Sequence, residues 1–214
     1  MFSYYGAKTK IINLYPEPIY NKIVEPFAGS ARYSLKYFDK EIILYETFEK
    51  VFKIWEYLLQ ATEKDILSLP DVNTGDNIKD YKTITDVERW LIGYHVFRGS
   101  ARPCYQVRDS CNWNKDKIRI ANNLYKIKHW KIFNEDGLNH EWKDATYFVD
   151  PPYMVQSHKY NHYKMDYNRI KEKLKGDAQF IVCGNSNDTW LDFKPLIEMR
   201  GTNKKHIECI WVNT

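Results

Sequence analysis

The chain has 214 residues and a formal net charge of +4; 43% of its residues are hydrophobic and 28% are charged. This length suits one α/β domain with a hydrophobic core, alone or with an inserted lobe. Because no apolar run reaches about 18 residues and the first residues lack a secretory pattern, we expect neither a membrane-spanning helix nor a signal peptide. The four cysteines lack the paired spacing of a zinc ribbon, which indicates reduced thiols in a cytoplasmic protein.

Short apolar runs along the chain predict the strands of an α/β fold. They lie at residues 22–25, 41–45, 130–133, 146–149 and 179–183, and a further β-rich pair is expected within 206–212. Residues 31–38 and 47–60 have helical spacing between these runs. Strands that alternate with helices predict a doubly wound, mostly parallel sheet.

The alternation stops between about residues 61 and 129. This stretch holds a loop at 69–77 and helical patterns at 85–97 and 116–129, and Thr85 with Glu88 makes a capping box for the first of these helices. We therefore predict one domain built from 1–60 and 130–214, with 61–129 inserted into it.

Positive charge is concentrated in the second half of this insertion. Between residues 98 and 131 there are nine Lys or Arg residues against two Asp residues, a local net charge of +7. Aromatic side chains are interspersed with them, a pattern that suits a phosphate backbone and unstacked bases. The alternative is a solvated helical face whose lysines only cover the surface.

Asp150-Pro151-Pro152-Tyr153 follows the apolar run 147–149 and should therefore lie where a buried strand ends. There, a carboxylate, a proline carbonyl and an aromatic face can surround a planar aromatic amine. The two N–H groups of the amine would donate to Asp150 and to the Pro151 carbonyl, and its ring would lie against Tyr153. The alternative is a strand that leaves into a Pro-Pro turn with an N-capping Asp.

Two further strand ends carry candidate ligand-binding residues. The segment Glu25-Pro26-Phe27-Ala28-Gly29-Ser30 closes the first strand with small residues, which let a ligand approach the backbone, although it lacks a dinucleotide or P-loop fingerprint. Glu46 ends the second strand, where an acid can accept hydrogen bonds from ribose hydroxyls. The alternative for Glu46 is a surface residue near a helix start.

Three segments, Ser3 to Lys8, Glu25 to Ser30 and Asp150 to Tyr153, occur in the order of a known enzyme family. Together they resemble the Dam-type DNA adenine-N6 methyltransferases in their alpha arrangement, and the resemblance runs from Phe2 to Val212. It implies a Rossmann-like methyltransferase fold with a helical target-recognition lobe, S-adenosylmethionine as methyl donor, double-stranded DNA as substrate and no metal. It also implies a monomer or weak dimer in the cytoplasm of a bacterium or phage-infected host.

The resemblance assigns roles to individual residues. Tyr4, in place of the usual Trp, and Lys8 match the amino-terminal cofactor motif, Ala31 stands where a second Gly is often found, and Gly137 replaces the usual Phe after Asp136. The implied cofactor-binding residues are Tyr4, Lys8, Glu25, Phe27, Ala28, Gly29, Ser30, Glu46, Asp136 and Asp150. The implied catalytic residues are Asp150, Pro151, Pro152 and Tyr153, with Asp150 ionised at an ordinary pKa of about 3.9.

The segment 97–102 is similar to a family segment that contacts DNA, with Arg98 where Asn is usual. The predicted DNA-binding residues are Arg98, Arg102, Tyr105, Arg108, Lys115, Lys117 and Arg119. His158 and His162 are four residues apart without an acidic partner, so we expect phosphate contact rather than a metal site. Cys183, in a predicted buried strand, is interpreted as a packing residue.

Three other functions are considered. An RNA adenine methyltransferase would use the same chemistry on another polymer. A non-catalytic relative that binds S-adenosylmethionine or DNA would have no need of Asp150. A bifunctional restriction subunit is disfavoured because the chain has no room for a nuclease domain.

Overall fold

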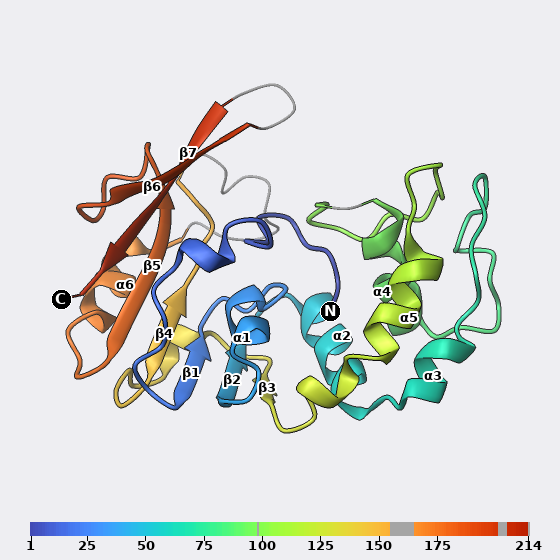
Figure 1. The fold of residues 1–214 in the computed structure, drawn as a ribbon, viewed down its shortest axis with the longest axis horizontal. Helices are drawn as coiled ribbons and strands as arrows, with labels where there is room; N and C mark the ends of the chain where they lie inside the picture. The colour runs from blue at the N-terminus through green and yellow to red at the C-terminus, as the bar shows by residue number, and fades with distance from the viewer. Residues whose placement is uncertain (98, 155–164, 201–204, 214) are drawn as a thin grey trace.

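The computed structural model describes residues 1–97, 99–154, 165–200 and 205–213. In this part of the chain seven strands form one sheet in the order β3-β2-β1-β4-β5-β7-β6 (Figure 1). Strands β1 to β5 pair in parallel, and β7 runs antiparallel to both β5 and β6. This confirms the doubly wound, mostly parallel sheet, with the strand order of a Rossmann-like methyltransferase fold. The strands are β1 (Lys22–Glu25), β2 (Glu41–Tyr45), β3 (Lys131–Phe133), β4 (Thr146–Val149), β5 (Gln179–Asn185), β6 (Lys194–Arg200) and β7 (Lys205–Val212).

The predicted strands are found with nearly their expected bounds, except at the carboxyl end. There the β-rich pair is not confined to 206–212, because the partner of β7 is β6, which begins at Lys194. A register shift between Pro195 and Ile197 accompanies the proline in this edge strand.

The helices of the described chain are α1 (Arg32–Lys36), α2 (Glu49–Gln60), α3 (Glu63–Ser68), α4 (Asp86–Val96), α5 (Trp113–Ala121) and α6 (Tyr167–Lys173), with 3₁₀ turns η1 (Ile12–Leu14), η2 (Leu124–Lys126) and η3 (Gly137–Asn139). The capping box of Thr85 and Glu88 at α4 is confirmed. The helix predicted over 116–129 is confirmed only over 116–121, because α5 ends at Ala121. Asn123 Nδ2 donates to the Arg119 carbonyl at 2.7 Å, which satisfies a carbonyl group at the end of α5 and stops the helix.

Both faces of the sheet are buried, so side chains of its central strands alternate between two cores. In β4, Phe148 faces a large core that also contains Trp55 of α2. Its neighbours Tyr147 and Val149 face a second core with Ile170 of α6.

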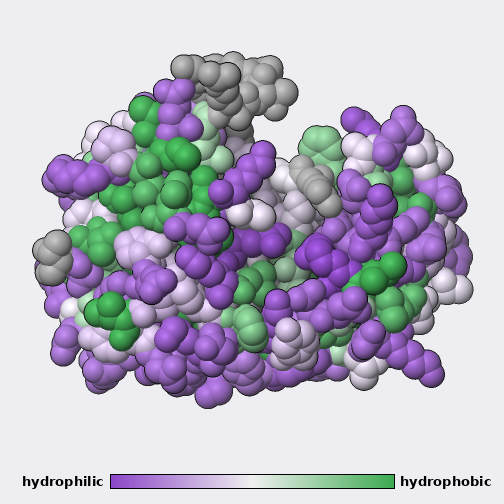
Figure 2. Space-filling view, in the orientation of Figure 1, coloured by the Kyte–Doolittle hydropathy of each residue, from purple (hydrophilic) through white to green (hydrophobic). Residues whose placement is uncertain are grey.

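The insertion lies beyond β3 at one end of the sheet, and the β6–β7 hairpin rises at the other (Figure 1). The large core continues into the insertion: Phe2 packs on Trp55 of α2 and Tyr94 of α4, with ring centroids 5.4 and 5.7 Å apart. Between these two sides the upper face of the molecule is hollowed (Figure 2). No helix among the described residues is long and apolar enough to cross a membrane.

Candidate functional site

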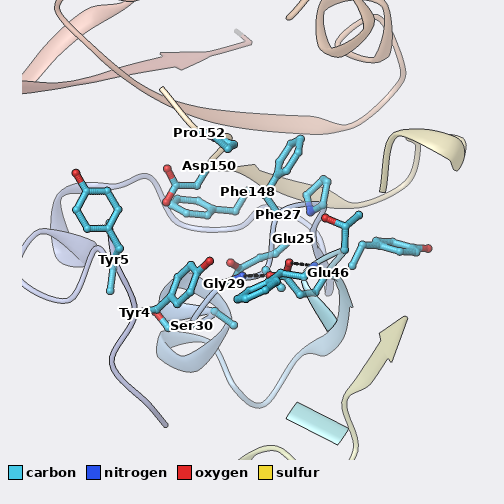
Figure 3. Close-up of a pocket in the computed structure, with 18 of the residues that line it drawn as sticks. Tyr4, Tyr5, Glu25, Phe27, Gly29, Ser30, Glu46, Phe148, Asp150 and Pro152 are labelled. Atoms are coloured by element: carbon cyan, nitrogen blue, oxygen red, sulfur yellow. Dashed lines mark hydrogen bonds between the residues drawn. The ribbon is translucent and has the colours of Figure 1, made fainter. Parts of the chain in front are cut away.

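A pocket opens at the carboxyl ends of β1, β2 and β4. The chain turns in opposite directions from the adjacent strands β1 and β4, which makes this edge the topological switch point where open α/β sheets bind ligands. All ten predicted cofactor-binding residues line this pocket: Tyr4, Lys8, Glu25, Phe27, Ala28, Gly29, Ser30, Glu46, Asp136 and Asp150. Figure 3 labels all of these except Lys8, Ala28 and Asp136. Three segments that are far apart in the sequence therefore meet at one place.

The turn after β1 brings backbone close to the pocket. Gly29 has a φ of +46°, and a Cβ atom there would lie 3.2 Å from the Tyr4 ring, so the ring packs directly on the glycine. Ala31, at the N-cap of α1, has a φ of +45° and lies in the left-handed region that glycine adopts without strain. The departure from the family pattern at Ala31 is thus accommodated at a cost in backbone strain.

Two acids on the pocket wall have raised pKa values. Glu46 accepts hydrogen bonds from the backbone N–H of Gly29 at 3.0 Å and of Phe48 at 2.8 Å, yet burial raises its pKa to about 7. Glu25 accepts one from Ser34 N–H at 2.8 Å, and burial raises its pKa to about 8. Both acids therefore exchange protons near neutral pH, where a bound cation or hydroxyl would favour their charged form.

Asp136 is held by groups on both sides. Its Oδ1 accepts from Leu138 N–H at 2.9 Å, and its Oδ2 pairs with Arg169 Nη1 at 2.7 Å. A Cβ atom at Gly137 would lie 2.8 Å from the Pro26 Cα, so η3 approaches the β1 turn too closely for the family's phenylalanine. Arg169 of α6 also lines the pocket and was not predicted; the N-capping Asp166 was the sequence signal for that helix.

Asp150 directly follows β4, with its side chain 23% exposed. Lys8 Nζ lies 2.8 Å from both of its carboxylate oxygens. The expectation of an ordinary pKa for Asp150 is wrong, because burial raises it against the opposing charge of Lys8. For Lys8, burial alone would lower the pKa, but the charges of Asp150 and Glu208 outweigh it and raise the value. Lys8 therefore partners the carboxylate as well as lining the pocket.

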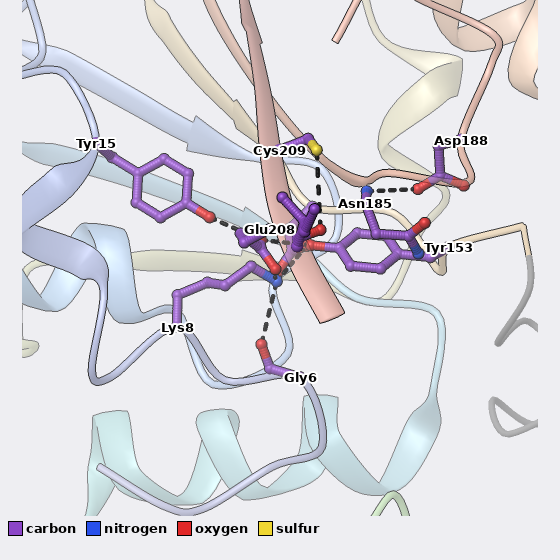
Figure 4. A network of polar contacts seen from close by, with 10 residues as sticks. Gly6, Lys8, Tyr15, Tyr153, Asn185, Asp188, Glu208 and Cys209 are labelled. Carbon is purple, nitrogen blue, oxygen red and sulfur yellow. Dashed lines mark hydrogen bonds and ion pairs between the residues drawn. The ribbon is translucent and has the colours of Figure 1, made fainter. Parts of the chain in front are cut away.

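The rest of the tetrapeptide is fixed from neighbouring elements. Of the described residues around the pocket, Asp150 and Pro152 line it while Pro151 and Tyr153 do not. The Tyr167 hydroxyl donates to the Pro152 carbonyl at 2.7 Å. Tyr153 reaches toward β7 instead, where its hydroxyl donates to Glu208 Oε1 at 2.6 Å (Figure 4).

The segment 99–102 lies beside the amino-terminal motif. Gly99 N–H donates to Ser3 Oγ at 3.0 Å, and Tyr5 N–H donates to the Ser100 carbonyl at 3.1 Å. Ala101 lines the pocket. The segment predicted to contact DNA is thus adjacent to the pocket mouth, although Arg98 itself lies outside the described residues.

The other predicted DNA-binding residues fall into three environments. Those with exposed side chains are Arg102, Arg108, Lys115 and Arg119, although Arg119 Nε lies 3.1 Å from Asp116 Oδ1. Tyr105 is half-buried, with Lys79 Nζ 4.8 Å from its ring centroid.

Lys117 is the exception in this set, because it is buried. Its Nζ donates to the Leu69 carbonyl at 2.8 Å and to Asp71 Oδ1 at 2.6 Å. The prediction of a phosphate contact for Lys117 is therefore contradicted: its charge holds the insertion together.

Two remaining predictions concern metal and thiol chemistry. His158 and His162 lie outside the described residues, and among the residues that the structure describes no group of three His, Cys, Asp or Glu side chains could hold a metal ion. Cys183 is buried in β5, as predicted for a packing residue, and burial raises the pKa of its thiol.

Comparisons with known proteins find likenesses among solved structures but no matching family model or curated protein. The solved structures include "Putative methyltransferase yhhF from Escherichia coli", which is 10% identical. That match covers 88% of this chain and 74% of the other, with a TM-score of 0.37. The fold assignment therefore rests on the strand order and orientation of the sheet itself.

Proposed function

We propose that this protein transfers a methyl group from S-adenosylmethionine to the N6 amino group of adenine in DNA. The observation that carries the proposal is the position of Asp150-Pro151-Pro152-Tyr153 at the end of β4, on the border of the pocket where the ten predicted cofactor-binding residues meet. A carboxylate beside a donor pocket is the arrangement that activation of an aromatic amine requires.

The charges and the aromatic side chains of the pocket lining support S-adenosylmethionine as the donor. Its described lining has five acidic side chains against three basic ones, which favours a ligand with a sulfonium and an ammonium group: Glu25, Glu46, Asp136, Asp150 and Asp166 against Lys8, Arg32 and Arg169. Glu46 would accept hydrogen bonds from ribose hydroxyls, and Phe27, Tyr45 and Phe48 would offer aromatic surface to an adenine ring. Gly29 and Ser30 of the β1 turn line the pocket and would contact the methionine portion.

The residues of the tetrapeptide provide the chemistry on the acceptor. The N6 lone pair of adenine is delocalised into the ring, and hydrogen bonds from its two N–H groups to Asp150 and the Pro151 carbonyl favour a localised pair. Lys8, 2.8 Å from Asp150, stabilises the carboxylate in its acceptor form. When bound, S-adenosylmethionine supplies a methyl group whose bonding electron pair remains on sulfur as the methyl leaves. The nitrogen pair forms the new N–C bond, and one N–H proton passes to water.

The acceptor base has to leave the duplex to reach this site. Tyr153 offers it an aromatic face, and the exposed Arg102, Arg108 and Lys115 offer charge to the phosphates. This basic surface favours a nucleic acid over a small amine as the substrate.

The test is a transfer assay with labelled donor on duplex DNA, with N6-methyladenine identified by mass spectrometry. We expect Asp150→Ala to bind donor within a few-fold of the parent and to lose transfer, while the control Asp192→Ala, at an exposed residue paired with Lys194, keeps it. Turnover by Asp150→Ala would contradict the mechanism. Transfer to RNA but not DNA would identify an RNA methyltransferase, and donor binding without transfer to any nucleic acid would identify a non-catalytic relative.

A further inference from the structure

Glu208 of β7 is a buried acid that the sequence did not single out. It is 3% exposed, and its Oε1 accepts hydrogen bonds from two tyrosine hydroxyls, Tyr15 at 2.8 Å and Tyr153 at 2.6 Å (Figure 4). A carboxylate removed from water requires donors of this kind. One of the two donors belongs to the tetrapeptide.

A second connection runs through Lys8. Lys8 Nζ lies 3.5 Å from Glu208 Oε1 and 2.8 Å from the oxygens of Asp150, so one cation serves two carboxylates. The same nitrogen lies 5.0 Å from the centroid of the Tyr153 ring. Glu208 is thus linked to the ring of Tyr153 through the tyrosine hydroxyl, and to the carboxylate of Asp150 through Lys8.

The antiparallel strand β7 explains why Glu208, which is far from Asp150 in the sequence, lies close to it in the structure. Strand β7 lies between β5 and β6, and Glu208 pairs with Asn185 at the carboxyl end of β5. Strand β5 is in turn the neighbour of β4, whose end carries Asp150. Asp188, just after β5, accepts from both Asn185 N–H at 2.8 Å and Met154 N–H at 2.9 Å, which ties the chain after Tyr153 to the same edge.

The hydroxyl bond determines the orientation of the Tyr153 ring. A tyrosine whose hydroxyl is anchored at 2.6 Å to a buried carboxylate has its ring plane fixed before a base arrives. Loss of the anchor leaves the ring surface in place but frees it to rotate, and stacking on a misaligned ring displaces the amine from Asp150.

We propose that Glu208 is a positioning residue, which acts through the Tyr153 hydroxyl and through Lys8 to align the aromatic face and the carboxylate that receive the target base. The inference rests on the proposed function, since it assigns the stacking role to Tyr153. A purely structural Glu208 would stabilise the fold through Tyr15 and leave the rate of the folded enzyme unchanged.

The test compares Glu208→Gln, which removes the charge but keeps the shape, with Tyr153→Phe, which removes the hydroxyl but keeps the ring. We expect each to lower kcat about 10-fold or more, with donor Kd within about two-fold. The double variant should be no slower than the slower single variant, because Glu208→Gln weakens and Tyr153→Phe removes the same charge-assisted hydrogen bond. A duplex with 2-aminopurine in place of the target adenine should fluoresce more in each variant complex, since the base stacks less well.

A matched control is Tyr57→Phe, since the Tyr57 hydroxyl donates to Glu88 at 3.2 Å between α2 and α4, away from the pocket. It should keep the parental kcat and fluorescence. Parental kcat in Glu208→Gln, or losses that multiply in the double variant, would overturn the inference. Should Glu208→Gln not fold, parental kcat and fluorescence in Tyr153→Phe would overturn it equally. A parent that binds donor but methylates no nucleic acid would instead refute the proposed function.

Discussion

Buried ionisable side chains have different roles at the pocket and in the insertion. At the pocket, Glu25 and Glu46 face an opening, and burial leaves them with pKa values of about 8 and 7. In the insertion, Lys117 is bonded to Asp71 and the Leu69 carbonyl, and buried His95 lies 2.8 Å from Asp116. The first group has capacity left for a ligand, whereas the second holds helices and loops together.

The difference teaches that a buried charged residue indicates a binding site only where it faces an opening. Lys117 and Lys115 illustrate this, because they are two positions apart in α5 and have opposite environments. Lys115 is exposed and Lys117 is buried. Substitutions at these two positions separate a structural charge from an available one.

The largest effect is expected from Lys117→Ala. Loss of the two charged hydrogen bonds should lower the free energy of unfolding by about 2 kcal/mol, measured by urea denaturation. The matched variant Lys115→Ala should change it by less than about 0.5 kcal/mol. Equal stability of the two variants would show that Lys117 is not part of the scaffold.

The contrast also shows which parts of the site could be predicted. Phe27 to Gly29, Glu46 and Asp150 follow apolar runs directly, and the ends of parallel strands meet at one edge, so their convergence follows from local patterns. The sequence could not show that Glu208 lies near Asp150, because this depends on β7 pairing with both β5 and β6 in the sheet. Lys117 was misassigned because its partner carbonyl lies 48 positions away in the sequence.

The fold shows the same division. Apolar runs predicted the parallel strands, while the short helices α3 and α6 were missed because only their caps mark them: Thr62 with Asp65, and Asp166. A cap of one or two side chains is a weak signal in a chain that has 15 Asp and 10 Thr residues. Packing against the sheet and the insertion, rather than periodicity, stabilises such short helices.

The second prediction concerns the protons on the pocket acids. Under the proposed function Glu46 accepts hydrogen bonds from the ribose of the donor, and because its pKa is raised to about 7 in the free protein, this acceptor is fully ionised only above that pH. Donor affinity should therefore rise about tenfold from pH 6 to pH 8, with proton release detectable by calorimetry in buffers of different ionisation enthalpy. Glu46→Gln should remove the contribution of Glu46 to this rise, while Glu25, whose pKa of about 8 lies in the same range, keeps its own. An unchanged pH dependence in that variant would exclude Glu46 as the titrating group.

A third, smaller effect separates Lys115 from Lys117 in DNA binding. Lys115→Ala should weaken duplex binding a few-fold and reduce the salt slope, log Kd against log salt concentration, by about one unit. Folded Lys117→Ala should bind with the parental slope, since its ammonium group is turned to Leu69 and Asp71. A reduced slope for Lys117→Ala alone would reverse the assignment of the two residues.

The smallest effect is expected at the turn that shapes the pocket. Ala31 has a φ of +45°, which costs an L-residue about 1–2 kcal/mol, whereas glycine gains about 0.5–1 kcal/mol of extra chain entropy in the unfolded state. Ala31→Gly should therefore raise the free energy of unfolding by about 0.5 kcal/mol, measured by urea denaturation. The control Ala121→Gly, at the last residue of α5, should lower it by about 1 kcal/mol. If Ala31→Gly lowered the free energy of unfolding as much as its control does, Ala31 would not be strained in its left-handed conformation.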